Sequence, residues 1–114
     1  MHIKGEAKLL RIFVGESDKS GNIPVYEKIV LAARENELAG ATVFKGIMGY
    51  GGKSRIHTTK ILRLSEDLPL TIEIVDETEK IEKFIPIVDQ IFESSKSGGL
   101  ITIEKAEIIK YTHG

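Results

Sequence analysis

The chain has 114 residues, of which 29% are charged, with a formal net charge of -1 and no cysteine. This length favours one domain, and a domain of this size buries roughly two thirds of the surface that its unfolded chain exposes. The balanced charge gives no overall attraction to nucleic acid or anionic lipid, and the lack of cysteine excludes disulfides and thiol chemistry. We therefore expect a single domain over residues 1–114 that does not bind nucleic acid.

The sequence offers no segment suited to a membrane. No apolar run approaches the ~20 residues that span a bilayer, and the N-terminal MHIKGEAKLL lacks the apolar region of a signal peptide. We therefore expect a cytoplasmic protein that is not embedded in a membrane.

The first half of the chain shows a strand, a helix and a second strand. Residues 7–14 alternate in the way that a strand with one buried face does. After Pro24, which suits a first helical turn, apolar residues recur at helical spacing from Val25, and Gly40 closes the predicted helix. Residues 41–50 alternate again and predict a second strand that ends in a glycine-rich stretch.

The second half repeats this order after an excursion. Residues 53–67 carry weak signals and are interpreted as a loop. Leu70, Ile72 and Ile74 alternate with polar neighbours and predict a third strand, and residues 100–111 predict a fourth.

A second helix is predicted between these two strands. Asp76 and Glu79 resemble the pair of residues that caps a helix N-terminus. Apolar residues then recur at helical spacing from Ile81 to Phe92. Pro86 lies inside this stripe and removes a backbone donor, so we expect a kink or a late helix start there.

This order of elements predicts an α+β fold, the ferredoxin-like βαββαβ plait. Its four-stranded antiparallel sheet carries two helices on one face, because right-handed crossovers place both on the same side. The other face is left bare, yet it carries apolar residues such as Leu9, Phe13, Phe44 and Met48. An exposed apolar face usually marks an interface, so we predict a homo-oligomer; a monomer with scattered apolar surface residues is the alternative.

The stretch FKGIMGYGGKSRIHTT, residues 44–59, combines glycine with positive charge. It is not a Walker-type phosphate loop, because the first glycine of that motif would stand at position 47, which is Ile47. Residues 46–49 match the GXXG of KH domains, but that motif joins two helices and this one lies in a predicted strand. An RNA-recognition sheet is a weaker alternative, because the chain has only four Phe and three Tyr and balanced charge.

Glycine and positive charge together favour an anionic ligand. Glycine lets backbone N–H groups turn toward a ligand, and consecutive N–H groups in a turn form an anion-binding concavity. Lys53 and Arg55 add positive charge. A second basic glycine loop, residues 96–99, precedes the last predicted strand. Two such loops in corresponding places of the two halves predict an anion site, with ordinary turns as the alternative.

Catalysis finds little support in the sequence. The three histidines lie far apart and are interpreted as solvated, so we expect neither catalytic residues nor a metal site. A small enzyme of the acylphosphatase type is an alternative, but it needs a phosphate-binding arginine after the first strand, where residues 15–22 offer only Lys19. An oligomeric scaffold without ligand is a further alternative.

Two segments resemble a known family. GATVFKGIMGYGGKSRIHT, residues 40–58, and LPLTIEIVDE, residues 68–77, resemble the PII-like family called domain of unknown function 190, and the resemblance covers nearly the whole chain. It implies a ferredoxin-like fold assembled as a homotrimer, like the PII nitrogen-regulatory proteins, which bind adenine nucleotides in clefts between subunits. It also implies a non-enzymatic signalling protein that requires no cofactor and takes ADP or ATP as ligand.

The resemblance also implies which residues meet the ligand. They come from the end of the second strand, the glycine loop before the last strand and the basic residue of that strand. The implied ligand-binding residues are Gly46, Ile47, Met48, Gly49, Tyr50, Gly51, Gly52, Lys53, Arg55, Lys96, Gly98, Gly99 and Lys110. The chain departs from PII proteins in residues 51–53, which read Gly-Gly-Lys where those proteins carry a glutamine that helps to bind metal, nucleotide and 2-oxoglutarate.

From these residues we expect a regulatory trimer that signals through residues 53–67. Lys53, Arg55 and Lys96 would meet phosphate, and Ile47 or Met48 would line the pocket for the base. Ligand binding would order the 53–67 loop, which then docks on a protein partner such as a transporter or an enzyme. Such a signal requires that the ligand bind the ordered and disordered loop states with different affinity.

Overall fold

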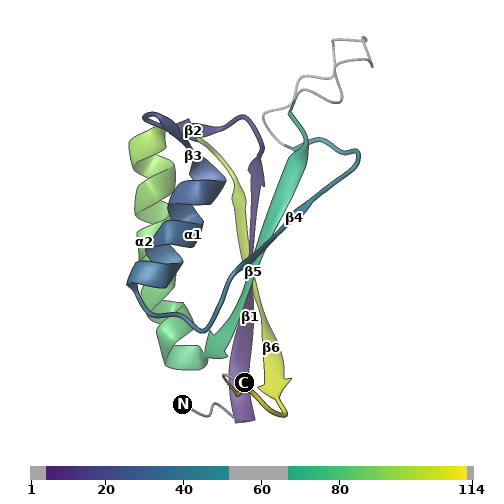
Figure 1. Cartoon of the computed structure of the whole chain (residues 1–114), viewed down its shortest axis with the longest axis vertical. Helices are drawn as coiled ribbons and strands as arrows, with labels where there is room; N and C mark the ends of the chain where they lie inside the picture. The colour runs from purple at the N-terminus through teal and green to yellow at the C-terminus, as the bar shows by residue number, and fades with distance from the viewer. Residues whose placement is uncertain (1–4, 52–66, 113–114) are drawn as a thin grey trace.

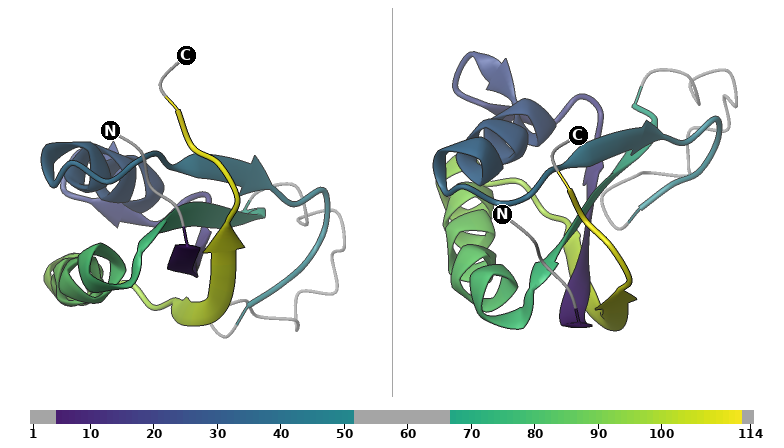
Figure 2. Two further views of the ribbon diagram at one scale, coloured as in Figure 1. Left: turned by 90° about the horizontal axis from the view of Figure 1, so that it is seen from below. Right: turned by 60° about the horizontal axis from the view of Figure 1, so that its bottom comes forward.

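The computed structural model describes residues 5–51 and 67–112, which form a sheet covered on one face by two helices (Figures 1 and 2). A small two-stranded sheet lies between the first strand and the first helix. In chain order the elements are β1 Gly5–Gly15, β2 Lys19–Ser20, β3 Ile23–Pro24, α1 Val25–Glu35, β4 Thr42–Lys45, β5 Pro69–Glu77, α2 Thr78–Ser95 and β6 Leu100–Ile108.

The main sheet has the strand order β4-β5-β1-β6, and every neighbouring pair is antiparallel. This order, with both helices on one face, confirms the predicted ferredoxin-like plait of the α+β class. The strands β5 and β1 pair at the centre of the sheet, and Ile12 of β1 lies opposite Ile72 of β5 and Ile101 of β6. The central strand β1 therefore fixes the register of the sheet on both sides.

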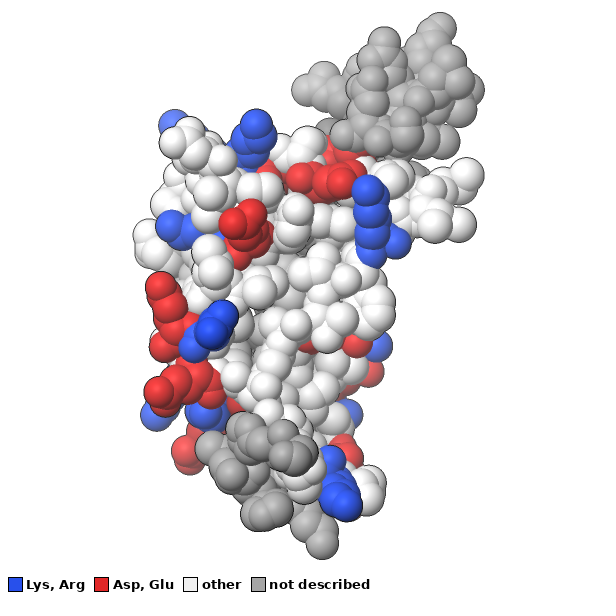
Figure 3. Space-filling view, in the orientation of Figure 1, with Lys and Arg blue, Asp and Glu red and all other residues white. Residues whose placement is uncertain are grey.

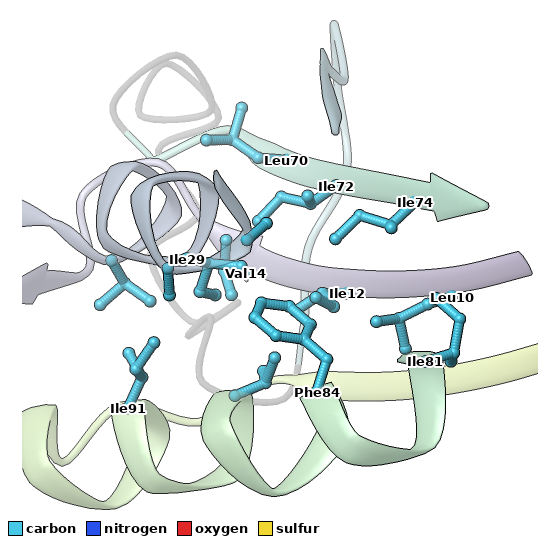
Figure 4. Close-up of a cluster of buried hydrophobic side chains, with 14 residues drawn as sticks. Leu10, Ile12, Val14, Ile29, Leu70, Ile72, Ile74, Ile81, Phe84 and Ile91 are labelled. Carbon is cyan, nitrogen blue, oxygen red and sulfur yellow. The ribbon is translucent and has the colours of Figure 1, made fainter. Parts of the chain in front are cut away.

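The core lies between the sheet and the two helices (Figure 4). Leu10, Ile12 and Val14 are the alternate residues of β1 that point toward α2, as the sequence predicts. From the helix side, Phe84 and Ile81 are buried against them. Each such side chain contributes roughly 1.5–3 kcal/mol by leaving water, so the alternating strands and the helical stripe hold the two layers together.

Helix α1 ends earlier than the sequence predicts. Its C-cap is Asn36 rather than a residue near Gly40, and Glu37 adopts a left-handed φ of 57°. The amide of Asn36 donates to the carbonyl of Ala32, and that of Leu38 donates to Ala33. Because these residues already satisfy the last carbonyls of the helix, no glycine is needed there.

Helix α2 begins directly after β5 and continues through its proline. The predicted late start at Pro86 is wrong, because the helix spans Thr78–Ser95. The predicted capping pair is also wrong: the N-cap is Glu77, and it makes no side-chain cap hydrogen bond. Asp76 instead turns into the protein, as described below.

Two strands are shorter than predicted, and one hairpin was not predicted. Strand β4 stops at Lys45: the amide of the next residue, Gly46, still donates to the carbonyl of Pro69, but Pro69 has no N–H to donate in return, so the pairing ends there. Strand β6 stops at Ile108 instead of reaching residue 111. The predicted turn after β1 contains the β2–β3 hairpin, and the predicted loop 53–67 lies outside the described residues except for Asp67.

The sheet face away from the helices is apolar at its edges and charged at its centre. Phe44 of β4 and Phe13 of β1 flank Thr71 in one cross-strand row, and Phe44 is 51% exposed. Leu9 also lies on this face, but Met48 lies beyond the end of β4, so its predicted place on the face is wrong. We call this surface the open face.

Arg11 occupies the centre of the open face between two carboxylates. Its Nε donates to Glu73 at 2.9 Å, and its Nη1 donates to Glu104. The hydrogen bond to Glu73 is the largest cause that raises the pKa of Arg11, so the guanidinium stays charged. The three side chains tie β5, β1 and β6 together across the face.

Neither of the described helices is long and apolar enough to cross a membrane. Figure 3 shows charges of both signs mixed over the visible surface, in keeping with the net charge of -1.

Asp76 is the buried charged residue of the described core, and it connects two distant segments. Its side chain is 0% exposed, Oδ2 accepts from the amide of Ala39 at 2.9 Å, and Oδ1 accepts from the amide of Glu77 at 2.6 Å. The carboxylate therefore ties the connection after α1 to the junction of β5 and α2.

We predict that Asp76→Ala lowers the free energy of unfolding by about 1–3 kcal/mol, because the partly buried amide of Ala39 would lose its partner. Urea unfolding measures this, with Asp89→Ala on the exposed side of α2 as the control that should change little. Equal stability of the two variants would contradict the assignment.

Candidate ligand site at the end of the sheet

Four chain segments meet at one end of the sheet because of the directions in which its strands run. Strand β5 runs antiparallel to β1 and β4, and β6 runs antiparallel to β1. The last residues of β1 and β4 therefore lie at the same end of the sheet as the first residues of β5 and β6. A cavity of about 380 Å³ opens there, and it is lined by Phe13, Val14, Gly15, Asp18, Tyr50, Gly51, Asp67, Pro69, Gly98, Gly99 and Leu100.

This cavity brings the two glycine segments of the sequence together. Tyr50 and Gly51 reach it from the stretch after β4, and Gly98 and Gly99 reach it from the loop before β6. Both pairs belong to one chain.

Gly99 is required on one wall of the cavity. A Cβ at this position would lie 2.6 Å from Cζ of Phe92 and 2.7 Å from the carbonyl oxygen of Phe13. The loop that leads to it turns sharply, because Lys96 adopts a left-handed φ of 56° and the amide of Ser97 donates to the carbonyl of Phe92. The absence of a side chain thus lets the 96–99 loop lie directly against the end of β1.

A proline shapes the second wall. A Cβ on Gly46 would lie 2.9 Å from Cγ of Pro69, and one on Gly49 would lie 3.0 Å from the same atom. Gly49 also has a φ of 156°, close to the limit of the left-handed region. The two glycines therefore have a packing reason to be small, and they place the 46–51 segment over the start of β5.

The turn after β1 forms the floor of the cavity. Oδ1 of Asp67 accepts from the amide of Ser17 at 3.0 Å, and the amide of Glu16 donates to the carbonyl of Leu68 at 2.9 Å. Glu16 also pairs with Lys45 at the end of β4 at 2.9 Å. The turn thus connects β1 to both segments that border residues 52–66.

The cavity combines apolar walls with acidic groups. Phe13, Pro69 and Leu100 offer apolar surface, and Asp18 and Asp67 are the charged groups among the described lining residues. Lys96 is exposed on the loop that carries Gly98 and Gly99. The described part of the cavity therefore suits a ligand with an apolar part, hydrogen-bond donors and a separate anionic part.

The other implied residues that the structure describes are not among the lining residues of this cavity. Ile47 and Met48 are 95% and 67% exposed and do not line the cavity of the single chain, so their role in a pocket for the base stays a prediction. Lys110 lies beyond the far end of β6, where it borders a second cavity of about 430 Å³. Gly52, Lys53 and Arg55 lie outside the described residues.

Sequence reasoning missed most of the cavity lining, including Phe13, Asp18, Asp67 and Pro69. The one available signal was a pair of aspartates, one just after the first predicted strand and one just before the third. Their meeting depends on the strand order, which brings positions about fifty residues apart to one edge. Within the described ranges, no three His, Cys, Asp or Glu side chains are grouped so that they could hold a metal ion.

The fold is that of PII-like proteins. The structure of apo CPII, a nitrogen regulatory PII-like protein from Thiomonas intermedia K12, matches 98% of this chain and 100% of its own with a TM-score of 0.64 and 12% identity. CPII bound to ADP and bicarbonate matches 90% of this chain and 88% of its own, with a TM-score of 0.63 and 15% identity. At such identities the likeness shows the shared fold.

The sequence comparisons define the family. The model for DUF190, described as "Uncharacterized ACR", matches residues 7–108, so the chain belongs to the DUF190 family. A UPF0166 protein of Aquifex aeolicus is 41% identical over 102 residues, which cover 90% of this chain and 92% of the relative. A UPF0166 protein of Methanocaldococcus jannaschii is 37% identical over 105 residues, covering 92% and 94%. The resemblance drawn from the sequence is confirmed.

We predict that Gly99→Ala destabilises the protein by about 1–3 kcal/mol, because the added methyl group would overlap the backbone of Phe13 and the ring of Phe92. Gly51→Ala is the matched control, since a Cβ there meets nothing within 4 Å in the described structure. Chemical denaturation of both variants checks this. A Gly99→Ala protein as stable as the control would show that the loop packs differently.

Proposed function

We propose that this protein is a non-catalytic regulatory protein that binds an adenine nucleotide, such as ADP, ATP or AMP, at the cavity between β1, β5 and β6. The observation that carries the proposal is the meeting of two glycine segments at one cavity. The related fold of CPII has been seen with ADP and AMP, which supports this class of ligand.

The dimensions and chemistry of the cavity support a nucleotide. Its volume of about 380 Å³ lies in the range of small-molecule pockets. Phe13, Pro69 and Leu100 can contact a base or a sugar, while the backbone at Gly98 and Gly99 allows close approach of phosphate oxygens. Lys96, Lys53 and Arg55 supply the positive charge in this proposal, and Gly52 precedes Lys53 in the sequence.

In this proposal the nucleotide site is complete only in a homotrimer, where a neighbouring subunit adds residues that the same chain cannot supply. Lys110 stands beyond the far end of β6, and a strand rises roughly 3.3 Å per residue, so it lies on the order of 30 Å from the 98–99 loop of its own chain. Lys110 can therefore act on the nucleotide only from a neighbouring subunit. The exposed Ile47 and Met48 likewise suit contact with a neighbour.

We propose that the subunits of the trimer contact one another through the open face. Exposed apolar surface at Phe44, Leu100 and Val75 would be removed from water there, and the Arg11 network would be shielded at its centre.

Signalling would pass through residues 53–67 to a protein partner in the cytoplasm. The turn after β1 is well placed to transmit the change, because it lines the cavity through Asp18 and holds Asp67 and Leu68 at the base of that segment. A ligand shifts such an equilibrium only if it binds the two states of the segment differently.

We predict that ADP at about 100 times its dissociation constant raises the free energy of unfolding by about 2.7 kcal/mol. Thermal unfolding with ADP, ATP and AMP measures this, with tripolyphosphate as the control for phosphate alone. Native mass spectrometry of the same samples should give the mass of a trimer. Turnover of an acyl phosphate would instead favour an enzyme, and a trimer that no nucleotide stabilises would favour a scaffold.

A second prediction tests the contribution of the neighbouring subunit. Lys110→Gln should weaken ADP binding about tenfold, because a charge-assisted hydrogen bond to phosphate is lost. Lys105→Gln is the matched control, since Lys105 is also exposed on β6 but borders neither cavity. Titration calorimetry compares the two. Equal affinities would remove Lys110 from the proposed site.

A further inference from the structure

Two apolar features of the chain lie at opposite ends of the sheet (Figure 1). One is the pair Ile47 and Met48, which follows β4 and which we call the apolar tip. The other is the cavity of about 430 Å³ at the C-terminal end of β6, which we call the far cavity. We propose that the apolar tip of one subunit inserts into the far cavity of a second copy of this chain. This contact, which rests on the homotrimer of the proposed function, holds its subunits together.

The apolar tip is held away from the core of its own chain. The amide of Gly46 donates to the carbonyl of Pro69 at 2.8 Å, and Gly49 lies against the ring of the same proline. These contacts fix the backbone on both sides of the tip and leave Ile47 and Met48 almost uncovered. Neighbouring large apolar side chains that their own chain does not cover are typical of an interaction surface.

The far cavity is lined mainly by apolar side chains, and hydrogen bonds fix its walls. Figure 2 shows the chain after β6 crossing back over the sheet, where the hydroxyl of Tyr111 donates to the carbonyl of Ala39 at 3.0 Å. The amide of Ala39 in turn donates to the buried carboxylate of Asp76. A cavity that is preformed in this way loses little freedom when a partner enters. Its lining residues come from the open face, the connection after α1 and the crossing segment, and they are Ala39, Val75, Ala106, Glu107, Ile108, Ile109, Lys110 and Tyr111.

The apolar tip cannot reach the far cavity of its own chain. Pro69, against which the tip is held, begins β5, and Val75, which lines the far cavity, lies six positions later on the same strand. A strand rises roughly 3.3 Å per residue, so about 20 Å separate the two features. A tip that occupies the far cavity must therefore come from another copy of the chain.

The two features carry most of the exposed large apolar side chains of the described residues, which number nine. Ile47, Met48 and Tyr50 belong to the segment after β4. Val75 and Ile109 line the far cavity and are 39% and 74% exposed. One type of contact between copies can therefore cover more than half of this set, which favours a second copy as the occupant of the cavity.

The proposed contact joins two different surfaces, so each subunit gives its tip to one neighbour and its far cavity to the other. A head-to-tail contact of this kind forms a closed ring when its rotation closes, as a homotrimer requires. The contact also brings Lys110, which lines the far cavity, beside the segment that carries Tyr50 into the ligand cavity of the neighbour. It thereby explains how Lys110 of one subunit reaches the nucleotide held by the next.

Cysteine cross-linking of the full chain tests the contact, because the native sequence has no cysteine. The double variant Met48→Cys/Ile109→Cys is treated with a bis-maleimide shorter than the roughly 20 Å that separate the two features within one chain. Denaturing mass spectrometry should show covalent dimer and trimer. Leu31→Cys/Ile109→Cys is the matched control and should stay monomeric, since Leu31 is exposed on α1 outside both features. Each single-cysteine variant should also stay monomeric, because the tip meets a cavity and not another tip.

Sedimentation equilibrium measures how much each feature contributes. Ile47→Asp and Val75→Asp should each weaken subunit association about a hundredfold, because a carboxylate would enter an apolar contact, and Leu31→Asp should leave it unchanged. An equimolar mixture of Ile47→Asp and Val75→Asp should form dimers that neither variant forms alone, since one chain keeps its far cavity and the other keeps its tip. Circular dichroism shows whether each variant folds, and Met48→Asp or Ile109→Asp replaces one that does not.

Two kinds of result would overturn the inference. A native trimer whose double variant gives no cross-link, or whose association survives both Ile47→Asp and Val75→Asp, would show that other surfaces hold the subunits, and the proposed nucleotide function would stand. A monomeric native protein would overturn the inference together with the homotrimer. If the expected cross-links form but ADP does not bind, the proposed ligand fails and the contact between tip and cavity stands.

Discussion

Close approach at glycine is the constraint on which the site depends. Gly99 lies against the backbone of Phe13 and the ring of Phe92, and Gly15 lies under the carboxylate of Asp67. At each place a single methyl group would force neighbouring atoms apart. At Gly99 one of the nearest atoms belongs to the backbone, so the 96–99 loop can lie against β1 because that side chain is missing; at Gly15 the nearest atoms are at the end of the Asp67 side chain, which can move.

Periodicity in the sequence predicted the layers well because burial in the core is decided locally. Leu10, Ile12 and Val14 alternate along one strand, and Ile81 and Phe84 follow a helical stripe, and each pattern holds in the structure. The predicted element boundaries were wrong where a contact with a residue distant in the sequence determines them. Pro69 accepts from Gly46 but has no N–H to donate in return where β4 ends, and the buried Asp76 accepts from the amide of Ala39 instead of capping its own helix.

In the candidate site, too, local sequence patterns predicted some features, and contacts between distant residues produced the rest. Glycine and lysine composition pointed to the two segments that reach the cavity, but it gave no hint of the acidic floor. Asp67 meets Ser17 fifty positions earlier in the chain, and that contact exists only because β1 and β5 pair antiparallel. The order of elements and the family resemblance both predicted the fold, yet the described residues that the resemblance implied are divided between the cavity, the exposed surface and the far end of β6.

The strand order explains how one small cavity could influence a surface beyond it. The turn after β1 holds Leu68 by a backbone hydrogen bond and pairs with Lys45 through Glu16, so it touches both β4 and the residues just before β5. The same turn carries Asp18 into the cavity. Any group that pulls or repels Asp18 or Asp67 therefore acts on the supports of the segment between β4 and β5. In a regulatory protein of this fold, recognition and response would then share one set of hydrogen bonds, and no separate relay through the core is required.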